Sequence, residues 1–261
     1  MTPKSFALAV ALVVALSGTA GAVTIDYLAP TGQTAQADFS FTNATHLQII
    51  LRETTLAAAS TLTGGDAILT GIGFLLPDSA VIVLPGTVNI CSTALCGSNS
   101  SSVGFSGGAF GAGANVSAEW GATIGGEKPI GNGSSFDFVS VIEAQVTQFS
   151  GTNRDGPAGL NGPQGGLLDD SAAQGGLGVI DNSVRILLTL DENPLTAGNQ
   201  GLSAAQQSAF LTSIYTQSVV KWGSESAYGN PVPEPGTLLL LGSGLSGLAA
   251  CGWRRRSRVD G

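Results

Sequence analysis

The sequence predicts an all-β body over residues 23–230, a β-sandwich of jelly-roll or immunoglobulin-like type with one short helix. Its apolar residues alternate with polar ones in short runs, which is the spacing of strands rather than of helices. Gly, Pro, Asn and Asp separate these runs, as in turns. Of the 261 residues, 38 are Gly and only 11% are charged, whereas a coiled coil would be rich in Glu, Lys and Arg. We therefore expect strands joined by turns and loops.

Residues 1–22 have the parts of a secretory signal peptide. Lys4 precedes the apolar run 6–16, and Ala20 and Ala22 stand in the A-x-A relation that a signal peptidase recognises. A run of this length is too short to span the ~30 Å of hydrocarbon in a membrane. We predict cleavage after Ala22, with a buried N-terminal helix as the alternative.

Two segments of the body, 47–51 and 184–190, show the strand alternation most clearly. Their inward-facing residues are predicted to be Leu47, Ile49, Leu51, Val184, Ile186, Leu188 and Leu190, with Gln48 and Ile50 pointing away. Further strands are predicted at 37–42, 66–76, 80–91, 115–122, 136–147 and 217–222.

One helix is predicted over 203–216, packed on the edge of the sandwich or across its mouth. It begins with the capping box Ser203-Ala-Ala-Gln206. A single helical stripe would hold residues four apart, namely Leu202, Gln206, Phe210 and Ile214. The preceding stretch 150–178 is dominated by Gly, Asn, Asp, Pro and Gln and predicts a long loop.

The C-terminal segment 231–258 has three parts in a fixed order. Pro233, Glu234 and Pro235 come first, and the prolines keep the chain around the glutamate extended. An apolar run over about 237–253 follows, at the short end of what a transmembrane helix needs. Arginines come next and mark the cytoplasmic side, at Arg254, Arg255, Arg256 and Arg258.

This tail resembles the PEP-CTERM sorting signal, which exosortases of Gram-negative bacteria recognise. The resemblance implies that Pro233, Glu234 and Pro235 form the sorting motif and that the helix and arginines are removed after transient anchoring in the inner membrane. It also implies delivery of the body to the cell surface or an exopolysaccharide matrix, such as a biofilm. The resemblance is confined to the tail; an ordinary C-terminal anchor after a proline-rich hinge is the alternative.

The body without leader and tail is acidic. It contains sixteen acidic and five basic residues, which gives a net charge of −11. The basic residues are Arg52, Lys128, Arg154, Arg185 and Lys221. Such a surface cannot displace counterions from phosphates, which argues against a nucleic-acid partner. It favours solubility and weakens attraction to anionic surfaces.

The sequence assigns no catalytic residue and no metal site. His46 is the only histidine, which excludes a multi-histidine zinc centre. Ser106 fits a G-x-S-x-G pattern, but it stands in a Ser/Gly-rich stretch without the strand and helix that a nucleophile elbow needs. A carboxylate pair for glycoside hydrolysis is the remaining enzymatic alternative, and Glu119, beside Trp120, and Glu143 are its candidates.

No cofactor is predicted, although calcium stays open at acidic loop positions. The residues that could supply oxygen ligands are Asp169, Asp170, Asp181, Asp191 and Glu192, without EF-hand spacing.

Cys91 and Cys96 are predicted to form a disulfide, because both lie close together in a turn-rich part of an exported body. Two reduced, neighbouring cysteines are the alternative.

Together these observations predict an exported, non-enzymatic protein of the cell surface or extracellular matrix. Exosortase is its expected processing partner, and extracellular polysaccharide a further partner that the sequence leaves open. The alternative from another class is an exported polysaccharide-active enzyme that uses a carboxylate pair.

Overall fold

The computed structural model describes residues 21–55, 64–77, 80–105, 108–123, 128–129, 135–141, 146–149, 164–168, 178–191, 201–223 and 227–232. Residues 1–20 of the predicted signal peptide and the tail from Pro233 onward, with the expected transmembrane helix, lie outside these residues.

The described residues are mostly strand. The strands are β1 (Val23–Leu28), β2 (Thr34–Asn43), β3 (His46–Glu53), β4 (Leu69–Phe74), β5 (Val81–Ile90), β6 (Ser102–Val103), β7 (Gly121–Ala122), β8 (Lys128–Pro129), β9 (Ser135–Ser140), β10 (Thr147–Gln148), β11 (Leu167–Leu168), β12 (Val179–Asp181), β13 (Ser183–Asp191), β14 (Ser218–Trp222) and β15 (Ala227–Val232). The helices are α1 (Thr93–Cys96) and α2 (Ala204–Ser213), with 3-10 turns η1 (Gly64–Ala67) and η2 (Ser117–Glu119).

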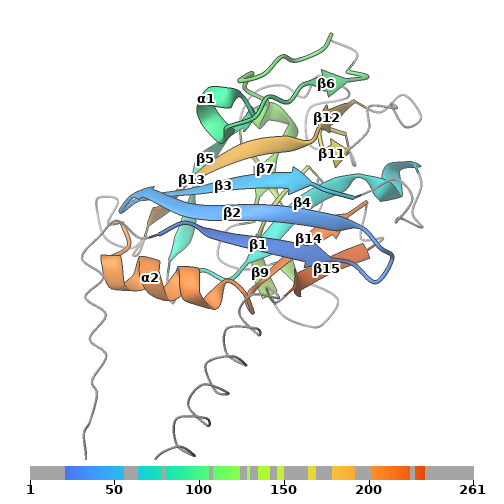
Figure 1. Ribbon diagram of the computed structural model, residues 1–261. Coiled ribbons are helices and arrows are strands. Elements are labelled where there is room, and N and C mark those ends of the chain that lie inside the picture. Colours follow the sequence, from blue (N-terminus) through green and yellow to red (C-terminus); the bar gives the residue numbers. More distant parts are fainter. Residues whose placement is uncertain are drawn as a thin grey trace, which may run out of the picture.

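Most of the strands follow one hydrogen-bonded order, β10-β7-β9-β4-β14-β15-β1-β2-β3-β13-β5. The short strands β6, β8, β11 and β12 lie off this path: β11 pairs with β4 and β12, β6 with β12, and β8 with β9. The sheet curls until β5 approaches β7, so that it is nearly closed. Figure 1 shows β1, β2 and β3 side by side at the front, with β4, β9 and β14 behind them. The all-β class is confirmed, whereas the sandwich type is not, because β15 links the front and rear strands into one path.

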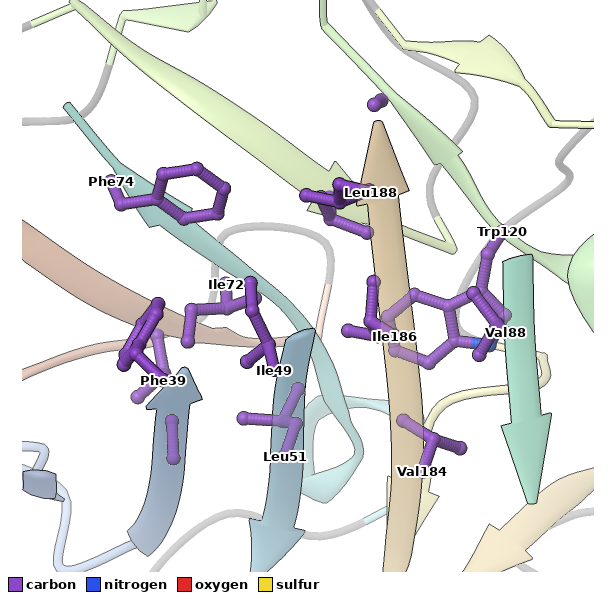
Figure 2. Close-up of a cluster of buried hydrophobic side chains, with 14 of the residues drawn as sticks. Phe39, Ile49, Leu51, Ile72, Phe74, Val88, Trp120, Val184, Ile186 and Leu188 are labelled. Carbon is purple, nitrogen blue, oxygen red and sulfur yellow. The ribbon is translucent and has the colours of Figure 1, made fainter. Parts of the chain in front are cut away.

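The core fills the space between the front and rear strands. Leu47, Ile49, Leu51, Val184, Ile186, Leu188 and Leu190 are all fully buried there, which confirms the predicted inward faces of β3 and β13. These two strands pair in antiparallel register, Ile49 opposite Ile186. In Figure 2 the indole of Trp120 lies beside Ile186 and Val88, while Phe39 and Phe74 fill the other side of the cluster.

The helix α2 covers the core between β2 and β4. The predicted capping box is present: the side chain of Ser203 accepts from the amide of Gln206, whose own side chain accepts from the amide of Ser203. The Phe210 ring makes edge-to-face contacts with Phe39, Phe41 and Phe74 at centroid distances of 6.2, 5.7 and 6.0 Å. Gln206 stays at the cap, and the helix instead buries Gln207 and Leu211 along with Phe210.

Two sequence expectations need correction. The strand predicted at 115–122 is interrupted by the turn η2 at Ser117–Glu119, and only Gly121–Ala122 is a named strand. A local hydrogen bond favours the turn, because the Asn115 side chain accepts from the Ser117 amide. A tertiary bond holds it against β5, where the Val88 amide donates to the Ser117 hydroxyl. The loop predicted at 150–178 contains β11, which pairs with β12 and β4.

Several strands were not predicted at all, and β1 and β15 are the most consequential. β15 reads Ala-Tyr-Gly-Asn-Pro-Val, a composition typical of turns. It is a strand because β14 pairs with its first half and β1 with its second half. Tertiary pairing therefore overrides local propensity here.

We expect Phe210→Ala to lower the free energy of unfolding by about 3–5 kcal/mol, because it leaves a cavity among three aromatic rings. Thr212→Ala, on the exposed side of the same helix, is the matched control and should change stability by less than about 0.5 kcal/mol. Urea unfolding of the purified protein measures both. Equal effects of the two substitutions would mean that α2 does not carry this core contact.

Candidate functional site at the root of the C-terminal tail

The tail leaves the body from the second half of β15. Asn230, Pro231 and Val232 pair with Leu28, Tyr27 and Asp26 of β1, respectively. On the other side of β15, the register with β14 ends at Gly229, opposite Val220. The last three residues of the strand are therefore held by β1, and Pro231 has no amide hydrogen to donate.

The strand β1 is itself fixed along its whole length by β2. Val23 pairs with Phe39 and Leu28 with Thr34. On the outer side, the Thr24 hydroxyl donates to Asp38 at 2.6 Å. The support of the tail is thus the regular antiparallel ladder of the front sheet.

Tyr215, two residues beyond the end of α2, lies beside the strand that holds Pro231 and Val232. The Tyr215 hydroxyl donates to the backbone carbonyl of Thr24 at 3.1 Å, so this residue lies beside the first half of β1. Figure 1 shows α2 along the same side of the sheet as β15. We refer to Thr24, Asp26, Tyr215 and Val232 together as the tail root.

Two buried polar contacts tie β14 to the front strands. The Trp222 indole donates to Glu53 Oε2 at 2.8 Å, and the Thr55 amide donates to Glu53 Oε1 at 3.0 Å. Glu53 is only 3% exposed, so these donors replace the water that its carboxylate loses. The sequence did not single out Glu53. It lies two residues after Leu51 on β3, so its side chain points to the same inward face.

The second contact joins Tyr27 to Ser218 at 2.7 Å. The Ser218 hydroxyl donates its one hydrogen to the carbonyl of Ile214 at 2.6 Å, so the Tyr27 hydroxyl donates to Ser218. Burial raises the pKa of Tyr27 well above its ordinary value, because the phenolate would lose its hydration.

Trp222 also requires a glycine on the neighbouring strand. A Cβ at Gly229 would stand 2.7 Å from Trp222 Cζ3. The indole therefore covers the backbone of β15 just before its pairing passes from β14 to β1. This close approach positions the start of the segment that carries the tail.

The outer face of the front sheet carries a row of hydrogen-bonded polar side chains, which we call the polar ladder. Its members are Asp26, Gln36, Asp38, Gln48, Arg52 and Arg185. Arg52 forms an ion pair with Asp38 at 2.6 Å, and Arg185 donates to Gln48 at 2.7 Å. The ladder presents carboxylate, amide and guanidinium groups across four neighbouring strands.

Cys91 and Cys96 form a disulfide in the structure, with an S–S distance of 2.10 Å. Cys91 is buried at the end of β5, and Cys96 is the last residue of α1. Gly97 follows with a φ of 77°, a left-handed conformation suited to glycine at a helix end. The bond therefore ties the short helix α1 to the core.

The carboxylate proposed for sugar hydrolysis at Glu119 is buried. The residue is 1% exposed in η2, and a Cβ at Gly165 would stand 2.7 Å from its Cβ. Trp120 is fully buried in the core rather than on a surface that could face a sugar. Its intended partner, Glu143, lies outside the described residues.

The single histidine, His46, is the first residue of β3, directly after the turn from β2. His46 Nδ1 lies 2.8 Å from the Thr45 hydroxyl and 2.9 Å from Asn43 Oδ1. Ser106 of the G-x-S-x-G pattern lies outside the described residues.

The calcium candidates do not converge in the described part of the chain. Asp181 ends β12, two residues before β13 begins at Ser183, and Asp191 is the last residue of β13. The eight steps from Ser183 to Asp191 span roughly 26 Å at about 3.3 Å per strand residue, so one cation cannot bind both acids. Asp169, Asp170 and Glu192 lie outside the described residues. Within the described ranges, no group of three or more His, Cys, Asp or Glu side chains is placed to hold a metal ion.

Comparison with known proteins places this chain among proteins that carry a C-terminal sorting tail. The PEP-CTERM protein-sorting motif matches residues 231–256. This motif marks exported proteins that an exosortase processes, and the match agrees with the resemblance seen in the sequence. No curated protein and no solved structure matches the chain. Among the helices in the ranges described above, none is long and apolar enough to cross a membrane.

We expect the stability of the protein to fall above pH 10 because of Tyr27. Its folded pKa is raised, so the contribution is complete below the unfolded pKa of about 10 and is lost as the pH rises toward the folded value. Between these values the free energy of unfolding should fall by about 1.4 kcal/mol per pH unit. Tyr27→Phe should flatten this slope in urea unfolding at pH 9–11.5, whereas Thr212→Ala, which removes no titratable group, should not. Parallel slopes for the wild type and Tyr27→Phe would contradict this assignment.

We expect the exported protein to contain the Cys91–Cys96 disulfide. Under denaturing conditions the pair should take up no alkylating reagent without reductant and two labels after reduction, as measured by intact mass. Cys96→Ser is the control, because its remaining Cys91 should take one label without reductant. Two labels on the unreduced wild-type pair would show free thiols instead.

Proposed function

We propose that this protein is an exported, non-enzymatic component of the cell surface or extracellular matrix. An exosortase removes its tail after the leader has directed export, and the body is then released into an exopolysaccharide layer. The observation that carries this proposal is the PEP-CTERM motif at residues 231–256, where Pro233, Glu234 and Pro235 precede an apolar run and an arginine cluster.

The position of the motif in the fold supports processing that leaves the body intact. Val232 is the last residue of β15, and Pro233 follows it directly. A cut after Val232 therefore removes no strand from the described sheet. The disulfide and the closed core suit a body that must persist outside the cell.

The polar ladder supports association with polysaccharide. Carboxylate, amide and guanidinium groups are donors and acceptors that can bond to sugar hydroxyls, and here they are already held in place by one another. The body charge of −11 disfavours strongly anionic polymers, because like charges repel. Neutral or weakly charged polysaccharides are therefore the better partners.

Of the two carboxylates in the enzymatic alternative, the structure describes only Glu119, and its position does not support this alternative. Glu119 is 1% exposed beneath Gly165 and lies next to the fully buried Trp120. A glycosidase needs both carboxylates beside the scissile bond, and a polymer could not reach this one in the observed fold.

We expect Glu234→Ala to slow removal of the tail at least about tenfold, because the substitution deletes the charged residue of the sorting motif. Immunoblots of cell fractions would measure this as full-length protein retained in the membrane fraction. Asp260→Asn is the matched control, since it removes an acidic residue of the same tail beyond the arginines. Normal processing of Glu234→Ala would contradict the exosortase proposal.

A further inference from the structure

The matched sorting motif overlaps the folded sheet. The match begins at residue 231, and Pro231 and Val232 are paired with Tyr27 and Asp26 of β1. The first two residues of the motif are thus part of the body, and the remainder continues from a fixed point on its surface.

The length of chain after this point limits where a processing enzyme can stand. Glu234 is two residues beyond Val232 and therefore at most about 7 Å from it. Thr237, where the apolar run begins, is five residues away, at most about 18 Å. A body of this length is roughly 40 Å across. An active site that receives Glu234 must consequently come into contact with the surface around Val232.

We propose that the tail root is a docking surface for the membrane-embedded protease that cuts the tail. This inference rests on the proposed function and adds the part of the body that the enzyme contacts. The contact surface is the outer side of the first half of β1, with Thr24 and Asp26, together with Tyr215, two residues beyond the end of α2. Both β1 residues are exposed, so they can meet a partner without unfolding of the sheet.

Charge favours a protein over the lipid surface as the occupant of this site. Asp26 is exposed and accepts a bond from Gln36, and Asp38 lies next to Thr24. These carboxylates belong to a body with a net charge of −11, which anionic headgroups repel. A protease surface that offers hydrogen-bond donors or basic groups is the complementary partner.

The test compares two arginine substitutions on the outer side of β1 in cells that process the full chain. Thr24→Arg places a long side chain in the tail root, and Leu28→Arg places the same side chain four residues away on the same face. Leu28 is 48% exposed, so arginine fits there without repacking. We expect Thr24→Arg to slow tail removal at least about threefold and Leu28→Arg to leave it unchanged. Pulse-chase labelling measures the rates.

A spacer separates a docking effect from a folding defect. Eight alternating Gly and Ser residues inserted between Val232 and Pro233 add roughly 16 Å of mean reach, which lets the enzyme cut without touching the body. We expect the spacer-containing protein with Thr24→Arg to be processed at the same rate as the spacer-containing protein without this substitution. If it stays slow there, the substitution acts through misfolding and the proposal is wrong.

The remaining outcomes are equally decisive. Unchanged processing of Thr24→Arg in the native chain overturns the docking surface. Faster processing also overturns it, since an added positive charge would then be drawing the body to anionic lipid. Failure of the proposed function itself is visible separately, because Glu234→Ala would be processed normally whatever the result at Thr24.

Discussion

The pairing of β15 with two partners is the constraint on which the rest of the structure depends. Its first half pairs with β14 of the rear strands and its second half with β1 of the front strands. This connection brings β14 opposite β1 and β3, so that Tyr27 reaches Ser218 and Glu53 reaches Trp222. The buried polar groups are then satisfied and the apolar residues between the two halves leave water together.

The same strand sets the relation between the body and its tail. A segment that only needed to be exposed could follow a long linker, but here the motif starts within a paired strand. Strand pairing stabilises the body up to Val232, whereas a protease needs extended, accessible chain beyond it. The paired strand ends at Val232, and Pro233 comes next. Proline has no amide hydrogen to donate to a neighbouring strand, so it suits this position.

Alternation made much of the front sheet predictable. β3 and β13 show it because one face of each meets the core, and the helix α2 was found from its capping box. β15 was missed because its Gly, Asn and Pro are turn formers locally, and its hydrogen-bonding partners are distant in sequence. At 115–122 a strand was predicted but a turn interrupts it. Side-chain hydrogen bonds of Asn115 and Ser117 hold this turn, although the composition favours a strand.

The sequence by itself determined the sorting motif, the strand character of the body, the start of α2 and the closeness of Cys91 to Cys96, because each depends on residues that are near one another in the chain. Only the tertiary structure decided that Glu119 is sealed in the core, that Glu53 accepts from Trp222 and that the motif begins on a strand held by β1. These features depend on register between strands distant in sequence, and a one-residue shift would exchange the inward and outward faces.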